Sequence, residues 1–202
     1  MNLPNRLSLI RIISVPVFLL FAVKPPQVVN AAFGFIGLGG AISAYSGFVL
    51  SYGLYVAGII FAAASVTDML DGYIARKNNQ VTELGIFLDP IADKMLVTAA
   101  LTALTARGVI GAWITALIIS REFVVTGLRL LAMSKGRVLA AGSLGKAKMI
   151  LQTVALIFLL FHNFNIRFLN AVNAGGLLLY AALVLTILSG ADYIIKNRKL
   201  FG

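Results

Sequence analysis

The sequence predicts an all-α integral membrane protein with six transmembrane helices and a short interfacial helix at its N-terminus. Three observations support this fold class. The mean hydropathy is +0.96. Only 12% of the residues are charged, whereas soluble domains carry about 25%. The chain has 202 residues, enough for about six helices of roughly 20 residues with short connections. We therefore expect a single membrane domain over residues 1–202.

The N-terminal segment combines positive charge with an apolar run. Arg6 and Arg11 precede the uncharged stretch Ile12–Val23, a pattern that signal peptides also show. We interpret it instead as a short interfacial helix that leads into the first span. Residues 24–48 are rich in Pro, Gly and Ala and carry one charge. We expect them to form an extracytoplasmic loop.

The second and third predicted spans flank a short polar turn. The second span covers about Val49–Thr67, residues Gly72–Thr82 form the turn, and the third span covers about Glu83–Ala106. Pro90 lies inside the third span. A proline there either opens the helix or kinks it. We expect a kink, because residues 85–88 are already apolar enough to be embedded in the membrane.

Three further spans, about Ile110–Ala132, Gly145–Phe161 and Ala171–Ile195, complete the fold. An even number of spans places both termini on one side, and Lys and Arg indicate which side, because cytoplasmic loops carry the excess of positive charge. The side of the termini has Arg6, Arg11, Arg76, Lys77, Lys135, Arg137, Lys196, Arg198 and Lys199. The other side has Lys24, Arg107 and Arg167. We therefore expect the termini and the acidic stretch between residues 68 and 93 to lie at the cytoplasmic side.

The net charge of +10 has two interpretations, namely nucleic acid or anionic lipid and phosphate. The chain has no long soluble basic segment, so we favour lipid and phosphate and expect no nucleic-acid partner. The absence of Cys excludes disulfides and thiolate metal sites.

Acidic residues are concentrated between Asp68 and Asp93, a stretch that holds five of the seven in the chain. Asp68 and Asp71 are three apart, and Asp89 and Asp93 are four apart, so each pair lies on one helix face. Four carboxylates without a counter-charge would repel one another and be costly to keep ionised beside lipid. A bound cation removes that cost.

The ligand set indicates the kind of cation. All the candidate donors are carboxylate oxygens, and the single His, His162, is far away in sequence. This set favours Mg²⁺, Mn²⁺ or Ca²⁺ over zinc or copper. Two such ions bridged by shared carboxylates would suit a displacement at phosphorus.

The same stretch resembles a family signature. CDP-alcohol phosphatidyltransferases have the motif Asp-x2-Asp-Gly-x2-Ala-Arg-x8-Gly-x3-Asp-x3-Asp, and every fixed position is present between Asp68 and Asp93. The resemblance extends from Pro4 to Gly190 and is weakest over residues 24–48. It implies an enzyme that moves a phosphatidyl group from CDP-diacylglycerol to an alcohol, releases CMP and needs two divalent cations, Mg²⁺ or Mn²⁺.

The resemblance also implies a role for each motif position. Asp68 and Asp89 match positions that bridge both metals, and Asp71 matches a ligand of one. Asp93 matches a ligand of the other metal and the base that takes the acceptor's proton. Because a metal-bound carboxylate is a weak base, this role requires that the metal also acidifies the acceptor hydroxyl.

Five further positions match contacts to CDP-diacylglycerol, namely Asn5, Ser8, Gly72, Arg76 and Thr82. A glycine permits close backbone approach to the nucleotide, and an arginine suits a diphosphate. The alternatives are a basic anchor beside the membrane for Asn5 and Ser8, a helix-ending glycine for Gly72 and a positive-inside arginine for Arg76.

A second set of residues bears on the acceptor. The segments 121–129 and 140–148, with their Arg-Glu-Phe and Gly-Lys-x-Lys elements, resemble the phosphatidylglycerophosphate synthase branch, whose acceptor is sn-glycerol 3-phosphate. The resemblance implies that the acceptor is bound by Arg121, Arg129, Lys146 and Lys148. Buried cations in a membrane are costly and usually serve a function. The alternatives are anionic lipid binding or structural ion pairing.

Helical spacing gives two more expectations for this set. Glu122 and Arg129 are seven residues apart and share a helix face, so we expect an ion pair between them. Lys146 and Lys148 are about 200° apart on a regular helix, so both cannot point inward. Both can do so only if one of them precedes the helix.

Other functions stay open at this point. Intramembrane charges also build transporters, although no internal repeat is visible. Within the family, the acceptor can also be phosphatidylglycerol, inositol, inositol phosphate or serine. The resemblance implies a homodimer, with an interface on the third and fourth spans or on small residues such as Ala174, Gly175 and Ala181, in the plasma membrane of a bacterium.

Overall fold

The computed structural model describes the backbone of residues 3–25, 35, 37, 39–78, 83–134 and 142–196. Within these ranges, the side chains of residues 3–8, 68–78, 83–90, 93, 133–134 and 163–164 lie outside the description. The described residues form helices and no strand, which confirms the all-α prediction. The chain divides into two compact units, unit 1 (Met1–Arg107) and unit 2 (Gly108–Gly202).

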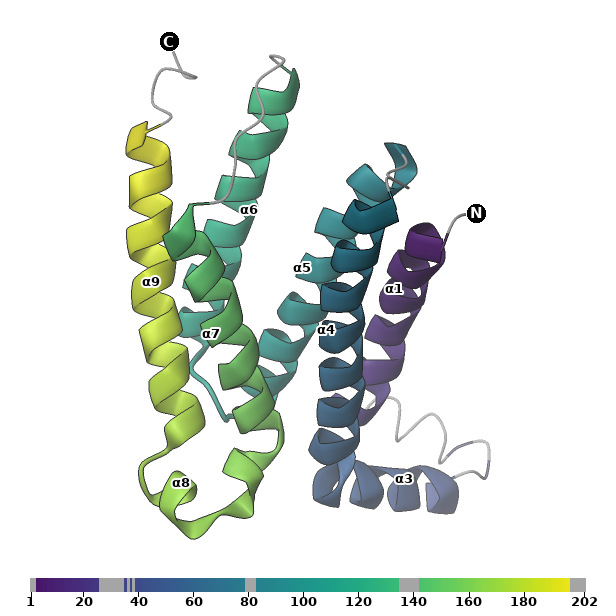
Figure 1. Ribbon diagram of the computed structural model, residues 1–202. Coiled ribbons are helices and arrows are strands. Elements are labelled where there is room, and N and C mark those ends of the chain that lie inside the picture. The colour runs from purple at the N-terminus through teal and green to yellow at the C-terminus, as the bar shows by residue number, and fades with distance from the viewer. Residues whose placement is uncertain are drawn as a thin grey trace. The chain divides into compact units, whose positions relative to one another are not determined.

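Figure 1 shows the helices of both units. Those of unit 1 are α1 (Leu3–Ala22), α3 (Gly39–Ser51), α4 (Gly53–Asn78) and α5 (Glu83–Ala106). Those of unit 2 are α6 (Ala112–Ser134), α7 (Ser143–Leu160), the 3₁₀ helix η1 (His162–Asn165), α8 (Arg167–Ala171) and α9 (Ala174–Lys196).

Unit 1 is built on α1, which packs against both α4 and α5. Phe18 of α1 and Phe61 of α4 are fully buried, with ring centroids 6.4 Å apart. Leu101 and Leu104 of α5 are also fully buried. The two helices that carry the aspartate motif, α4 and α5, therefore share α1 as a packing partner, and they also contact each other.

A sharp bend separates α3 from α4. Tyr52 lies between them, and the two helices are bent by 65° at this break (Figure 1). Gly53 starts α4 in close contact with α1, because a Cβ atom there would lie 2.2 Å from the carbonyl oxygen of Phe21. The structure therefore corrects two predictions: α3 occupies part of the expected loop 24–48, and the expected second span Val49–Thr67 begins inside α3.

Arg107, directly after α5, ties three helices together. Its Nε donates to the carbonyl oxygen of Ala22 at 2.8 Å. Its Nη2 donates to the carbonyl oxygens of Val49 at 2.6 Å and Phe21 at 3.5 Å. These carbonyls lie in the last turns of α1 and α3, where a helix leaves acceptors without an intrahelical donor. Burial lowers the pKa of Arg107, because desolvation disfavours the charged form.

In unit 2, α9 packs along α7 and also contacts α6. Leu156 and Leu160 of α7 and Leu179 of α9 are among its buried side chains. The chain turns between α7 and α9 through η1 and α8. At the start of α9, the Asn173 side-chain oxygen accepts a hydrogen bond from the Gly176 N–H at 3.3 Å. The predicted spans Gly145–Phe161 and Ala171–Ile195 thus correspond to α7 and α9.

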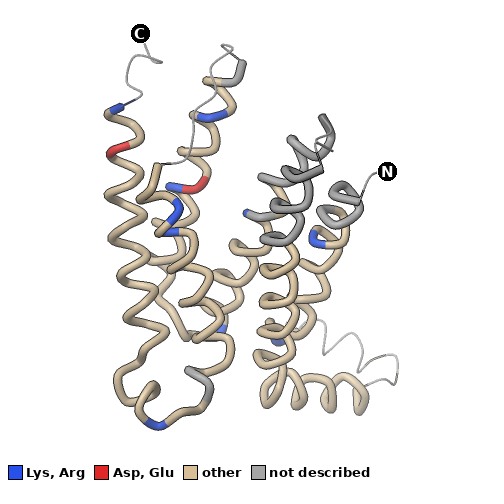
Figure 2. The backbone as a smooth tube through the Cα atoms, in the orientation of Figure 1, with Lys and Arg blue, Asp and Glu red and all other residues tan. Residues whose placement is uncertain are grey.

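Length and composition make several helices candidates for membrane spans. Within the described residues, α7 and α9 are long and apolar enough to cross a membrane. The bent pair of α3 and Gly53–Thr67 would add a third candidate if it forms one span. Figure 2 shows that α9 carries charged residues only near its C-terminal end. Leu177, Val184 and Ile187 of α9 are more than half exposed, as is typical of a lipid-facing surface. The count of six spans stays a prediction.

Other sequence-based expectations need correction. The turn expected at Gly72–Thr82 is helical up to Asn78, the end of α4. The interfacial helix is not a separate element, because α1 is one helix from Leu3 to Ala22 with Pro16 inside it. Pro90 does not open its helix, since α5 begins at Glu83; the kink stays a prediction.

The proposed dimer interface also changes. Gly175 is buried in the fold, so its surface is not available to a partner subunit. Ala181, on the same helix, is exposed. The small-residue interface on α9 can therefore include Ala181 but not Gly175.

Candidate functional site

The four aspartates of the motif lie on two contacting helices of unit 1. Asp68 and Asp71 belong to α4, and Asp89 and Asp93 belong to α5. The backbone is helical at all four positions, so the spacing that places each pair on one helix face holds. Their side chains lie outside the description, and the metal site stays a prediction. Among the side chains that are described, no group of three or more His, Cys, Asp or Glu could hold a metal.

The residues predicted to contact CDP-diacylglycerol belong to the same unit. Asn5 and Ser8 lie in the first turns of α1, and Gly72 and Arg76 lie in α4. Their backbone is described but their side chains are not, and Thr82 lies wholly outside the described residues.

The placement of Arg107 indicates how these segments are arranged. Its contacts join the end of α5 to the end of α1, beside the start of α4. The N-terminal end of α1, the C-terminal end of α4 and the N-terminal end of α5 therefore share the opposite end of unit 1 (Figure 1). The backbone of α1, α4 and α5 places each described residue predicted to bind metal or CDP-diacylglycerol in the half of its helix that is nearer this end.

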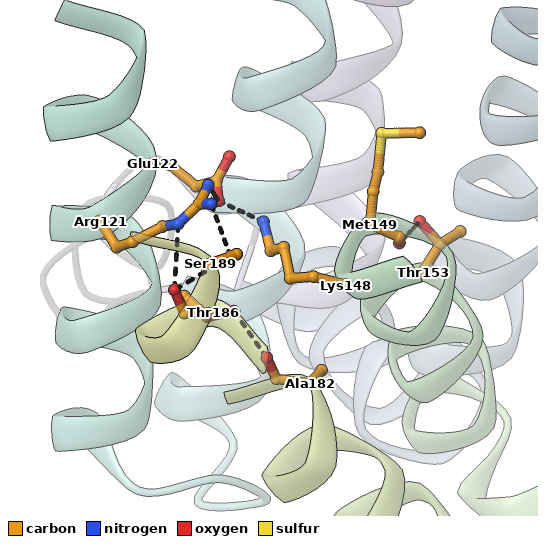
Figure 3. Close-up of polar contacts among 8 residues, drawn as sticks. All are labelled: Arg121, Glu122, Lys148, Met149, Thr153, Ala182, Thr186 and Ser189. Atoms are coloured by element: carbon orange, nitrogen blue, oxygen red, sulfur yellow. Dashed lines mark hydrogen bonds and ion pairs between the residues drawn. The ribbon is translucent and has the colours of Figure 1, made fainter. Parts of the chain in front are cut away.

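Glu122 lies between two cations in unit 2, as Figure 3 shows. Its Oε1 accepts a hydrogen bond from Arg121 Nη1 at 3.2 Å and forms an ion pair with Lys148 Nζ. The side chains of Lys148 and Glu122 are only 5% and 18% exposed. Charge-assisted hydrogen bonds between such buried groups are stronger than neutral ones, so this carboxylate links α6 to α7.

Arg121 also binds α9. Its Nε donates to the carbonyl oxygen of Thr186 at 3.2 Å, and its Nη2 donates to Ser189 Oγ at 2.7 Å (Figure 3). Thr186 and Ser189 are buried. Gly190 leaves space beside them, because a Cβ atom there would lie 3.1 Å from Arg121 Cγ. A hydroxyl, a carbonyl and a carboxylate thus fix the guanidinium in one orientation.

Arg129 does not make the predicted ion pair with Glu122. Its Cζ lies 5.5 Å from the ring centroid of Tyr193, beside the buried cluster of Val125, Leu128 and Tyr193. Seven residues along a helix are a rise of about 10 Å, and Glu122 pairs instead with Arg121 and Lys148. Arg129 Nε is buried and has no hydrogen-bond partner in the described structure.

The two lysines of α7 point to different sides. Lys148 is 4% exposed, whereas Lys146 is exposed. This confirms that both cannot point inward on one helix. Neither precedes the helix, because α7 begins at Ser143. Of the two, only Lys148 therefore belongs to the buried charged group.

Sequence reasoning missed the α9 side of this group. Thr186, Ser189 and Tyr193 are polar residues spaced three and four apart in a mostly apolar helix, a pattern that indicates a polar stripe facing other helices. That stripe is the feature of the sequence from which the α9 contacts could have been predicted. Asp192 lies off it and forms an exposed i,i+4 ion pair with Lys196 at 2.9 Å.

The buried group of unit 2 has an excess of positive charge. Among the described side chains there, Arg121, Arg129 and Lys148 carry three positive charges and Glu122 carries one negative charge, which is an excess of two. An anion such as a phosphate would balance this excess.

Comparison with known proteins assigns the chain to a family. The family model for CDP-alcohol phosphatidyltransferase matches residues 1–188. Proteins named CDP-diacylglycerol–glycerol-3-phosphate 3-phosphatidyltransferase are similar over nearly their full length. The protein from Bacillus subtilis (strain 168) is 41% identical over 97% of this chain and 95% of its own length.

Two further relatives with the same name agree. The Rickettsia bellii (strain RML369-C) protein is 36% identical over 99% of this chain and 97% of its own length. The protein from Escherichia coli (strain K12) is 33% identical over 98% of this chain and 95% of its own length. The chain therefore belongs to the CDP-alcohol phosphatidyltransferase family.

Proposed function

We propose that this chain is a membrane enzyme of phospholipid biosynthesis. It transfers the phosphatidyl group of CDP-diacylglycerol to sn-glycerol 3-phosphate, giving phosphatidylglycerophosphate and CMP. The observation that carries the proposal is the full-length similarity to relatives named for this donor and acceptor. The complete aspartate motif on α4 and α5 supports the same chemistry.

The donor side of the reaction belongs to the motif-bearing end of unit 1. Asp68, Asp71, Asp89 and Asp93 would hold two divalent cations, Mg²⁺ or Mn²⁺, because an all-carboxylate set suits hard ions. When bound, such ions neutralise the pyrophosphate and stabilise the charge on the departing CMP. Asp93 takes the proton from the attacking hydroxyl of the acceptor.

The remaining donor contacts come from the neighbouring segments of unit 1. Gly72 lets the backbone approach the nucleotide, and Arg76 binds the diphosphate. Asn5, Ser8 and Thr82 contact the lipid nucleotide. The positions of Asn5 and Ser8 on α1 and of Gly72 and Arg76 on α4 support this arrangement, because α1 and α4 pack together.

Acceptor binding falls to the cations of unit 2. Arg129 carries the strongest support, because its buried Nε has no partner in the described structure and a phosphate oxygen would supply one. Lys148 and Arg121 add positive charge within the same unit. Lys146 is exposed and would meet the acceptor on its way to the site.

The cellular setting follows from the family and from the charge pattern. The enzyme spans the bacterial plasma membrane six times, with both termini and the aspartate motif at the cytoplasmic face. The excess of Lys and Arg near the termini supports this orientation. The enzyme forms a homodimer.

The experiment that tests this function measures CMP release from CDP-diacylglycerol by the purified protein in detergent with Mg²⁺ or Mn²⁺. We expect release with glycerol 3-phosphate and none with glycerol, inositol, inositol phosphate, serine or phosphatidylglycerol. Asp93→Asn should lower the rate on the order of a hundredfold or more, the size of general-base catalysis.

The outcomes separate the alternatives. Release with a different alcohol would keep the chemistry and overturn the acceptor. Absence of release with every alcohol would overturn the enzyme and favour a transporter. Arg129→Met should raise the KM for glycerol 3-phosphate more than the KM for CDP-diacylglycerol; an equal rise in both would remove Arg129 from the acceptor site.

A further inference from the structure

Glu122 has a setting that no other described acidic residue shares. After residue 108 the sequence has only two acidic residues, Glu122 and Asp192. Asp192 is 42% exposed and pairs with an exposed lysine one helical turn away. Glu122 of α6 is 18% exposed and forms an ion pair with Lys148 of α7, which is 5% exposed.

The contacts of Glu122 form a continuous chain across three helices. Ser189 and the Thr186 carbonyl of α9 fix the guanidinium of Arg121. Arg121 Nη1 in turn donates to Glu122 Oε1, and the same oxygen binds Lys148 of α7 (Figure 3). The orientation of Lys148 thus depends, through Glu122, on a guanidinium that is anchored to a third helix.

A buried lysine needs this kind of support. An ammonium removed from water is costly unless it is paired, and its four-carbon stem allows many rotamers. Arg121 has a rigid fork with several fixed partners, whereas Lys148 has flexible bonds and a point charge. Because Arg121 holds the Glu122 carboxylate in place, that carboxylate in turn restricts the Lys148 side chain to few rotamers.

We infer that Glu122 is a positioning residue for the acceptor site, which holds Lys148 and Arg121 in the orientation that receives the phosphate of the acceptor alcohol. The inference rests on the proposed function. Glu122 carries a negative charge and does not itself bind the phosphate. Its removal should therefore affect acceptor use and leave use of CDP-diacylglycerol nearly unchanged.

The test compares Glu122→Gln, Glu122→Asp and wild type in detergent, with the KM for glycerol 3-phosphate, the KM for CDP-diacylglycerol, kcat and the thermal midpoint as readouts. For Glu122→Gln we expect the acceptor KM to rise on the order of tenfold, since removing one partner of a buried charge pair is costly, with less than a twofold change in the donor KM. Glu122→Asp should restore part of the loss. Asp192→Asn is the matched control, which removes an exposed carboxylate paired with lysine and should change each constant less than twofold.

A double variant checks that Glu122 acts through Lys148. In a Lys148→Met background, Glu122→Gln should raise the acceptor KM much less than it does in wild type. The same rise in both backgrounds, an equal rise in both KM values, or no rise at all would overturn the inference. If Glu122→Gln does not fold, Ser189→Ala takes its place: it loosens Arg121 without removing a charge, and a selective rise in acceptor KM is again expected.

The wild-type measurement separates the inference from the proposed function. A wild type that does not use glycerol 3-phosphate overturns both. A wild type that uses it, together with a Glu122→Gln variant that binds it normally, overturns the inference alone.

Discussion

Arg107 in unit 1 and Arg121 in unit 2 are both half-buried arginines that bind backbone carbonyl oxygens of other helices, but their surroundings differ. The hydrogen bonds of Arg107 all go to carbonyls in the last turns of α1 and α3. Arg121 binds a carbonyl, a hydroxyl and a carboxylate, and that carboxylate also binds Lys148.

These partners distinguish a structural arginine from one that belongs to a functional site. Helix-end carbonyls need donors in any fold, so Arg107 is explained by its own contacts. A carboxylate shared by a buried lysine and a half-buried arginine costs desolvation energy that packing alone does not require. The second arrangement is therefore the better candidate for a function, and variants of the two arginines should behave differently.

The largest effect is expected for Arg107→Met. It leaves the carbonyls of Phe21, Ala22 and Val49 without their donor, and each unsatisfied buried acceptor costs about 1–3 kcal/mol. We expect a loss of at least about 3 kcal/mol in the free energy of unfolding, seen as a lower thermal midpoint in detergent. The KM values of the protein that remains folded should be unchanged. A selective rise in the acceptor KM would contradict the structural role of Arg107.

Gly53→Ala tests the same junction from the backbone side. The new Cβ would lie 2.2 Å from the Phe21 carbonyl oxygen, so α1 and α4 must move apart. Overpacking of this kind costs about 1–3 kcal/mol. The matched control is Gly47→Ala in α3, where nothing lies within 4 Å of the new atom and alanine favours the helix. Equal thermal midpoints for the two variants would show that the contact at Gly53 is not tight.

The smallest effect on stability is expected for Arg121→Lys. Lysine keeps the charge but lacks the fork that binds Thr186, Ser189 and Glu122 together. We expect a thermal midpoint within a few degrees of wild type and an acceptor KM several times higher, measured by CMP release. Arg107→Lys is the comparison, and it should show the reverse pattern. If both lysine variants lowered the thermal midpoint and left the acceptor KM unchanged, the distinction between the two arginines would fail.

Much of the fold was predictable, because long apolar stretches dominate it. The spans expected at Ile110–Ala132, Gly145–Phe161 and Ala171–Ile195 correspond to α6, α7 and α9. The failures lie where composition is ambiguous. Residues 39–48 belong to a stretch rich in Pro, Gly and Ala that suggested a loop, yet they form most of α3. The polar residues after Asp71 suggested a turn, but they continue α4 to Asn78, since a helix can extend beyond the apolar region.

The candidate site was predictable in its residue types and less so in its contacts. Helical spacing identified Lys146 and Lys148 as facing different sides but could not say which faces inward. Spacing also suggested the pair of Glu122 and Arg129, which is wrong because contacts between helices decided the outcome. Glu122 meets Lys148 from α7, and Arg129 meets Tyr193 from α9. Such contacts depend on tertiary packing, which spacing along one helix does not contain.

The position of Arg107 has a mechanical consequence for the donor lipid. Arg107 joins α1, α3 and α5 at one end of unit 1, and the aspartate-bearing parts of α4 and α5 lie toward the other end. A helix of 24 residues is about 36 Å long, so tilting it by about 3° moves the tip by about 2 Å. The same small tilt would therefore change the spacing of the helices much more at the end where the donor lipid is proposed to bind than at the end that Arg107 joins.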